Sequence, residues 1–125
     1  MLKSQFPAIS THNTEHTMTE NKLQSQCYTA FHGNYPHLRG LLCYNLNNSR
    51  NLIDGNRNKA MGLQAGRSDM VLYYRAQAVH IEFKLPGQSQ SKAQREWQEL
   101  IESHGFRYEV VSSVDQFQRL IQEVV

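Results

Sequence analysis

The segment 66–84 alternates apolar and polar residues with a period of two, which is typical of paired β-strands with one buried face. Residues 70–74 form the first run and residues 79–83 the second, with a short connection between them. The large apolar side chains share one parity in each run: Met70, Leu72, Tyr74, Val79, Ile81 and Phe83. Because successive side chains of a strand point to opposite faces, this parity predicts the core side of a hairpin.

The opposite parity of this hairpin carries two acids and a lysine. A two-residue loop at 76–77 places Asp69 opposite Lys84 and Val71 opposite Glu82. A register shifted by one residue would turn half of the large apolar side chains away from the core. We therefore expect the three charged side chains to converge on the face that points away from the core.

Two carboxylates beside an ammonium group suit the hydrolysis of a phosphodiester. Mg²⁺ prefers oxygen ligands, usually one or two carboxylates together with waters and phosphate oxygens. With Asp69 and Glu82 as its ligands, such a cation polarises the phosphodiester and lowers the pKa of a bound water. Lys84 then orients that water or offsets the developing charge. The alternative interpretation is a solvent-facing strand whose charges only provide solubility.

The charged hairpin belongs to a longer series of motifs in a fixed order. The series runs through Gly62, 66–69 (GRSD), 81–84 (IEFK), 94–97 (QREW) and Gly105 before a strand. In this order the motifs resemble the VRR-NUC domain, a family of the PD-(D/E)xK nuclease superfamily. The resemblance extends from about residue 20 to the C-terminus.

The resemblance implies a restriction-endonuclease-like core, dependence on Mg²⁺ or Mn²⁺, and structure-selective cleavage of DNA. It places Asp69 at the first acid of the family, Glu82 at the second, Lys84 at the lysine and Gln94 at the helical glutamine. Ser68 stands where the family usually has proline. We expect this change to be minor, because that proline shapes the strand entry and is not a ligand.

A helix is predicted from about Glu20 to His32, with Thr17 or Thr19 as its cap. Its apolar stripe consists of Leu23, Cys27, Ala30 and Phe31. Glu20 falls over this stripe rather than opposite it. The resemblance implies that a glutamate near the N-terminus assists at the site. The alternative is that Glu20, in the first turn, only stabilises the helix by a favourable interaction with its dipole.

A strand is predicted over 41–46, and the asparagine-rich stretch 45–59 that follows it predicts a surface loop. Asparagine, arginine and lysine side chains suit phosphates and base edges. The candidate nucleic-acid contacts are Arg50, Arg57, Lys59 and Arg67. A short helix over 57–64 brings the last of these to the mouth of the site. A solvated loop, and an ion pair between Arg67 and the acids, are the alternatives.

The C-terminal part of the chain predicts helix, strand and helix. The first helix, over 92–104, starts at a capping box in which Gln94 is the partner of Ser91, an alternative to its catalytic role. Its apolar stripe consists of Trp97, Leu100 and Ile101. The strand over 106–111 is expected to lie parallel to the previous strand through a right-handed crossover, and a final helix follows Ser113. The predicted order is α-β-β-β-α-β-α, a small mixed α/β fold.

The length of 125 residues fits one domain, which we expect at 18–125 after a flexible leader at 1–17. The net charge of +2 is too small to indicate a nucleic-acid partner by itself. Two cysteines without a CxxC spacing favour a reducing compartment. No apolar run approaches the roughly 20 residues that cross a bilayer, and no export signal is present, so a cytoplasmic location is expected.

The sequence predicts a metal-dependent DNA endonuclease without an organic cofactor. Asp69 and Glu82 are the expected metal ligands, Lys84 orients the water, and Gln94 and Glu20 assist. By analogy with the family, we expect a homodimer that acts on branched DNA such as Holliday junctions or flaps. A DNA-binding or assembly module that keeps the nuclease fold without catalysis is the alternative.

Overall fold

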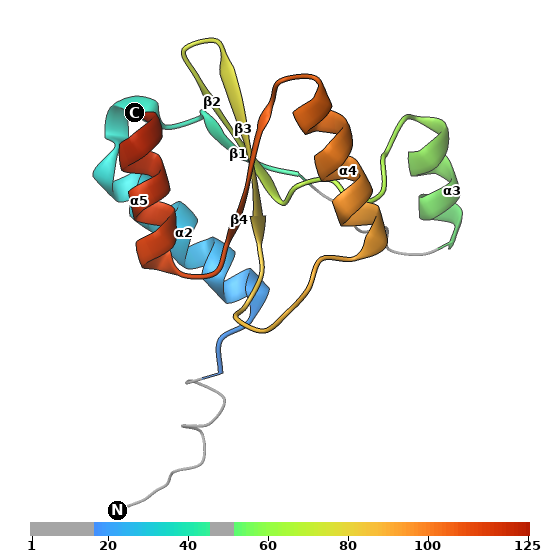
Figure 1. The fold of residues 1–125 in the computed structure, drawn as a ribbon, viewed down its shortest axis with the longest axis horizontal. Helices are drawn as coiled ribbons and strands as arrows, with labels where there is room; N and C mark the ends of the chain where they lie inside the picture. Colours follow the sequence, from blue (N-terminus) through green and yellow to red (C-terminus); the bar gives the residue numbers. More distant parts are fainter. Residues whose placement is uncertain (1–16, 46–51) are drawn as a thin grey trace, which may run out of the picture.

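The computed structural model describes residues 17–45 and 52–125. Its centre is a four-stranded sheet in the order β1-β2-β3-β4, with helices on both faces (Figure 1). The described elements, in chain order, are α2 (Glu20–Asn34), a 3-10 turn (Pro36–Leu38), β1 (Leu42–Tyr44), α3 (Leu52–Ala60), β2 (Met70–Tyr74), β3 (Gln77–Phe83), α4 (Lys92–Ser103), β4 (Arg107–Val111) and α5 (Val114–Val124). All but the last residue of the predicted leader lies outside the described residues.

The pairing of the strands confirms the predicted mixed α/β class. Strands β1, β2 and β3 pair antiparallel, and β4 lies parallel to β3. Helix α4 connects these two parallel strands, as the predicted crossover requires. Helix α3 replaces the short helix predicted over 57–64 and is absent from the predicted order of elements. It spans Leu52–Ala60, so much of the stretch predicted as a loop is helical.

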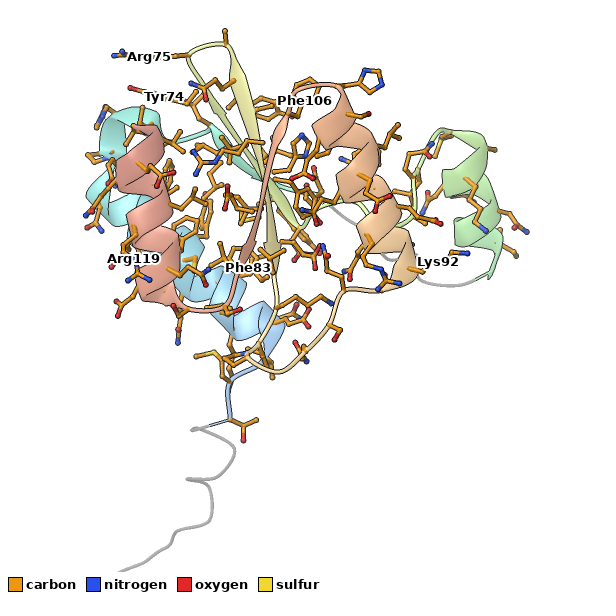
Figure 2. All side chains as sticks on the ribbon, viewed as in Figure 1. Tyr74, Arg75, Phe83, Lys92, Phe106 and Arg119 are labelled. Atoms are coloured by element: carbon orange, nitrogen blue, oxygen red, sulfur yellow. The ribbon has the colours of Figure 1, made fainter. Side chains whose placement is uncertain are left out.

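The hairpin of β2 and β3 has the predicted faces but a different register. Tyr74 pairs with Gln77 and Val71 with His80, so the turn consists of Arg75 and Ala76 rather than residues 76–77. The φ angles of Arg75 and Ala76 are 47° and 66°, the left-handed values that a tight hairpin turn requires. Arg75 projects from the tip of the hairpin (Figure 2). The observed register differs by two residues from the predicted one, and a shift of two preserves both faces.

The core of the protein lies between the sheet and the helices α2 and α5. Met70, Leu72, Val79, Ile81 and Phe83 from the hairpin are buried there, as predicted. Helix α2 contributes Leu23, Cys27 and Phe31, and α5 contributes Phe117, Leu120 and Ile121. The packing of these helices against one face leaves the other face to α4 (Figure 1).

The face of the sheet toward α4 is covered, which rules out the alternative of a solvent-facing strand. Val71 and Glu82 are buried on it, and Glu82 has no exposed surface. Helix α4 contributes the buried Ile101, whereas Leu100, predicted in the same stripe, is exposed. The amphipathic helix packs on this face because the face still carries apolar side chains between its polar ones.

The helices begin at the polar caps that the sequence suggested. The Thr19 side chain accepts a hydrogen bond from Lys22 N at 3.1 Å, so Thr19 rather than Thr17 is the cap of α2. Ser91 caps α4 and Ser113 caps α5 in the same way. Across the described ranges 17–45 and 52–125, no helix is both long and apolar enough to span a bilayer.

Candidate active site

Asp69 lies immediately before β2, where the chain enters the hairpin. Its Oδ2 accepts a hydrogen bond from Phe83 N at 2.7 Å, so the side chain reaches across to β3. Its backbone carbonyl accepts a hydrogen bond from Asn45 N at 2.8 Å, which ties the same residue to the end of β1. The carboxylate is therefore fixed between two strands, and Asp69 lies beside the residues that end β3.

Glu82 carries the most deeply buried carboxylate of the site. Its Oε1 accepts hydrogen bonds from the Tyr108 hydroxyl and from Gln90 Nε2, the latter at 3.2 Å. Its Oε2 is buried and has no hydrogen-bond partner. One oxygen is thus held by the protein while the other keeps its full capacity to accept. A buried carboxylate oxygen without a partner is an unfavourable arrangement unless a cation or another donor satisfies it.

Lys84 brings the acids from two elements together. Its Nζ lies 4.0 Å from Glu82 Oε2 and 3.9 Å from Glu20 Oε2. Its backbone N–H donates to Val111 O at 3.0 Å, which continues the parallel pairing of β3 and β4 beyond the strand. The side chain is only 14% exposed, so the ammonium group lies in the site rather than in bulk water. Glu20, predicted from the helix stripe, does reach this group.

The electrostatics of the site act against ionisation of Asp69. Burial raises the pKa of Asp69, and the neighbouring carboxylates of Glu82 and Glu20 raise it further. The Phe83 N–H and the Lys84 ammonium oppose this shift but do not cancel it. Three carboxylates around one ammonium leave a net negative site, which favours a cation.

Gly66 sets the distance between the entry to β2 and the start of α4. Its φ is +78°, and a Cβ built there would lie 2.3 Å from the carbonyl carbon and oxygen of Ala93. Only glycine fits such a close approach of two backbones. The contact holds the segment that leads to Asp69 against the N-terminal turn of α4.

Gln94 acts in the structure as the capping partner of α4. Its Oε1 accepts a hydrogen bond from Ser91 N at 2.8 Å, and Gln94 N donates to Ser91 Oγ at 3.1 Å. The capping interpretation is therefore correct, and a catalytic role for Gln94 stays a prediction. The amide that contacts Glu82 belongs to Gln90, whose Nε2 donates to Glu82 Oε1 and to Gln98 Oε1.

Tyr108 and Gln90 are the site residues that sequence reasoning missed. Tyr108 is buried on β4 and donates its hydroxyl to Glu82. Burial and this hydrogen bond raise the pKa of the Tyr108 phenol far above its usual range, so it remains a donor. The alternation of residues in β4 indicated that Tyr108 is buried. Its contact with Glu82 depends on the register between β3 and β4, which the sequence does not specify. Gln90, in a polar turn, gave no signal.

The predicted nucleic-acid contacts lie on and after α3. Arg57 and Lys59 are exposed on that helix, and Arg67 is partly buried before β2. A groove of about 420 Å³ at this end of the sheet is lined by Tyr44, Asn45, Asn58, Met61, Gly62, Leu63 and Arg67. Arg67 lies near His80, since its charge contributes, after burial, to lowering the pKa of His80. Arg50 lies outside the described residues.

The donor set of the site suits a hard divalent cation. Glu82 Oε2 is an orphaned buried oxygen, and Asp69 lies beside it. Within residues 17–45 and 52–125, no group of three or more His, Cys, Asp or Glu side chains forms a ready metal cluster. Two carboxylates are enough for Mg²⁺, which retains waters and takes phosphate oxygens from the substrate. The residues therefore fit a hard divalent cation such as Mg²⁺.

Comparisons with known proteins agree with this geometry. None of the curated proteins compared with the chain matches it. A solved structure described as a VRR_NUC domain protein superimposes with a TM-score of 0.74 at 21% sequence identity, covering 87% of this chain and 89% of that one. At this identity the likeness shows the fold. The sequence model of the VRR-NUC domain matches residues 16–115, most of the chain. The chain belongs to the VRR-NUC domain family, a family of nuclease domains that process DNA.

Proposed function

We propose that this protein is a divalent-metal-dependent endonuclease that hydrolyses phosphodiester bonds in DNA. The observation that carries the proposal is the buried Oε2 of Glu82, which lacks a hydrogen-bond partner and lies 4.0 Å from Lys84 Nζ. A binding module has no need of a buried, unsatisfied carboxylate oxygen next to an ammonium group. A hydrolytic site uses both groups.

Asp69 and Glu82 are the proposed ligands of Mg²⁺ or Mn²⁺, with Glu20 beside them. When bound, the cation supplies Lewis acidity toward the phosphodiester and lowers the pKa of a coordinated water. Tyr108 and Gln90 hold one oxygen of Glu82, so the other oxygen keeps a fixed direction.

Lys84 has two tasks in this proposal. Its ammonium donates hydrogen bonds to the attacking water and so orients it toward the phosphorus. As charge develops on the phosphate oxygens, the same group offsets it. The low exposure of Lys84 strengthens both effects, because a charge shielded from bulk water interacts more strongly with its neighbours.

The proposed substrate is branched DNA such as a flap or a Holliday junction, cut by a homodimer in the cytoplasm. A single domain of this size covers little duplex, whereas a symmetric pair places two active sites at a fixed separation. Arg67 lines the groove beside α3, and Arg57 and Lys59 are exposed on that helix, so these basic residues are the proposed contacts of the DNA backbone.

Cleavage of labelled DNA tests the proposal. Duplex, flap and four-way junction substrates are incubated with the protein in Mg²⁺, in Mn²⁺ or in EDTA. We expect cutting with either metal and none in EDTA. Replacement Lys84→Ala should reduce cleavage about a hundred- to a thousandfold, the effect of losing one donor that stabilises developing charge. Circular dichroism checks that the variant is folded.

Lys92→Ala is the matched control, because the Lys92 side chain is 82% exposed and pairs with Glu96 on the surface of α4. This variant should cut like the wild type. Absence of cutting on every substrate with both metals would support a DNA-binding module instead. Undiminished cutting by Lys84→Ala would remove the proposed mechanism while leaving nuclease activity in place.

A further inference from the structure

A second groove, of about 510 Å³, lies between α2 and the edge strand β1. Its lining residues are Asn21, Gln24, Ser25, Tyr28, Thr29, Leu42, Tyr44 and Met70. The volume falls in the range of sites that bind small ligands. Helix α2 packs over the centre of the sheet, so the outer strand β1 is left partly uncovered beside it.

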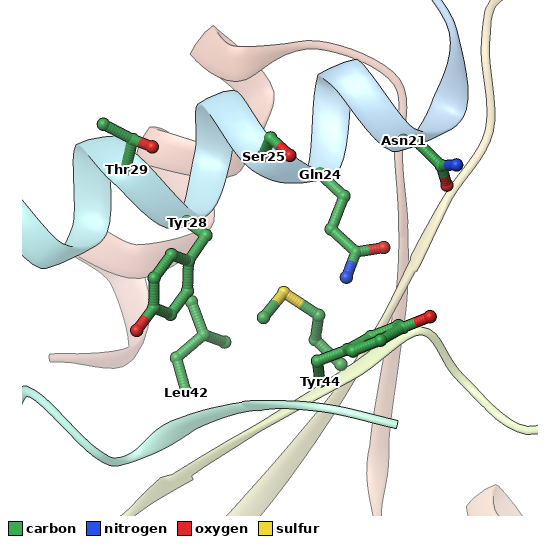
Figure 3. Close-up of a pocket in the computed structure, with 8 residues that line it drawn as sticks. Asn21, Gln24, Ser25, Tyr28, Thr29, Leu42 and Tyr44 are labelled. Atoms are coloured by element: carbon green, nitrogen blue, oxygen red, sulfur yellow. The ribbon is translucent and has the colours of Figure 1, made fainter. Parts of the chain in front are cut away.

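The walls of this groove combine aromatic rings with hydrogen-bonding groups. Gln24 and Tyr28 point from α2 toward β1, and Tyr44 lies across from Gln24 (Figure 3). Tyr28 is 40% exposed and Tyr44 62% exposed, although both rings are large enough to contribute to a core. The floor is apolar, because Leu42 and Met70 are buried. Amides read the edges of nucleobases, and tyrosine rings stack on their faces.

Helix α2 lines this groove and also carries Glu20 of the candidate active site. Gln24 follows Glu20 by one helical turn on α2, whereas Met70 and the adjacent Asp69 lie on opposite faces of the hairpin. Tyr44 also lines the groove beside α3 that contains Arg67, so it stands between the two grooves. A DNA backbone that lies in the groove of Arg67 therefore lies beside Tyr44, which lines the same groove.

We propose that the groove between α2 and β1 holds an unpaired nucleobase of the DNA substrate, stacked on Tyr44 and bounded by Tyr28 and Gln24. The proposal rests on the proposed function and adds to it a binding site for an unpaired base. A base enters the groove only after it leaves its pair, so the protein prefers DNA with an unpaired nucleotide next to the cleaved phosphate. Flaps fulfil this condition and fully paired duplexes do not.

Binding of three DNAs in EDTA, measured by fluorescence anisotropy, tests the proposal without cleavage. The first DNA carries a single-stranded flap, the second carries the same flap with abasic sites next to the branch, and the third is a blunt duplex. Tyr44→Ala should weaken binding of the first about five- to a hundredfold, the effect of losing one base-stacking ring. It should leave binding of the other two within about twofold.

Two control variants separate stacking from other effects. Tyr44→Phe retains the ring and should bind the flap within about threefold of the wild type, since the stacking surface is preserved. Tyr73→Ala removes a ring of similar exposure, 50%, from β2 outside the groove, and should change nothing. Equal weakening of all three DNAs by Tyr44→Ala, or failure of the wild type to bind any of them, would overturn the proposal.

Sedimentation velocity decides whether a second copy of the protein occupies the groove instead. If Tyr44→Ala dissociates a dimer and leaves flap affinity unchanged, the groove is a protein interface and the proposal is wrong. Failure of the proposed catalysis is distinguishable from failure of the base pocket. If the wild type binds the flap through Tyr44 but cuts no DNA in Mg²⁺ or Mn²⁺, the proposed catalysis is wrong and the base pocket stands.

Discussion

The two faces of the central sheet differ in how they use burial. On the face toward α2 and α5, the buried side chains are apolar, and Phe83 packs on Phe117 with ring centroids 6.3 Å apart. On the face toward α4, the buried groups include the polar Ser68 and the charged Glu82. Adjacent residues of β3, Glu82 and Phe83, thus face opposite environments.

This difference indicates that stability and chemistry are divided between the two faces. Burial of apolar surface stabilises the α2 and α5 side without any requirement for partners. Each polar group on the α4 side needs a partner, and Glu82 Oε2 and Trp97 Nε1 have no hydrogen-bond partner. The α4 side is therefore organised at the expense of stability, as expected for a preorganised site.

The largest predicted effect on stability separates the neighbours Phe83 and Glu82. Phe83→Ala should lower the free energy of unfolding by about 3–5 kcal/mol, because it opens a cavity in the apolar core. Glu82→Gln keeps an oxygen that accepts from Tyr108, and Lys84 keeps Glu20 as its partner, so we expect a loss of only about 1 kcal/mol. Urea unfolding in EDTA measures both, and a similar loss in the two variants would contradict the division.

An intermediate effect is expected at the contact between the two backbones on the α4 side. Gly66→Ala should lower the free energy of unfolding by about 3 kcal/mol or more, since the new Cβ overlaps the backbone of Ala93. Gly62→Ala is the matched control: its φ is also positive, at +104°, but the Cβ meets open space, so about 1 kcal/mol is expected. Equal losses would mean that the close approach contributes nothing.

The fold was largely predictable because the apolar parity of the hairpin and the amphipathic helices specify which faces meet. The register of the hairpin was not, since a shift of two residues leaves the pattern of Met70, Leu72 and Tyr74 on the same face. Polarity alone also suggested that Glu82 faces solvent. Its burial depends on α4 packing over it, which is a tertiary effect that no local pattern contains.

The proximity of the acids and the lysine of the candidate site was predictable, because they share one parity of two paired strands. Their supporting residues were not found from the sequence. Tyr108 reaches Glu82 across a parallel pair, and Gln90 does so from an irregular turn, so neither follows a period. Gln94 is the opposite case, because its capping box was predictable from the local sequence. Its side chain accepts a hydrogen bond from Ser91 N, as a capping box requires.

The smallest predicted effect on stability has the opposite sign. Burial raises the pKa of Asp69, so the folded protein binds that proton more tightly than the unfolded chain does. Stability therefore falls as pH rises through the interval between the ordinary pKa of aspartate, about 3.9, and the raised folded value. Above that interval the ionised carboxylate destabilises the metal-free protein.

Asp69→Asn removes this charge and keeps an oxygen that accepts from Phe83 N, so it should raise the melting temperature at pH 7 in EDTA while abolishing cleavage. The gain should shrink as the pH falls through that interval, because folded wild-type Asp69 takes up its proton there. Asp115→Asn is the control, because Asp115 is exposed in the first turn of α5 and its charge favours the helix dipole. That variant should lose a few tenths of a kcal/mol. If Asp69→Asn is less stable than the wild type, the favourable contacts of the carboxylate outweigh the cost of its burial. The charge of Asp69 then does not destabilise the folded protein.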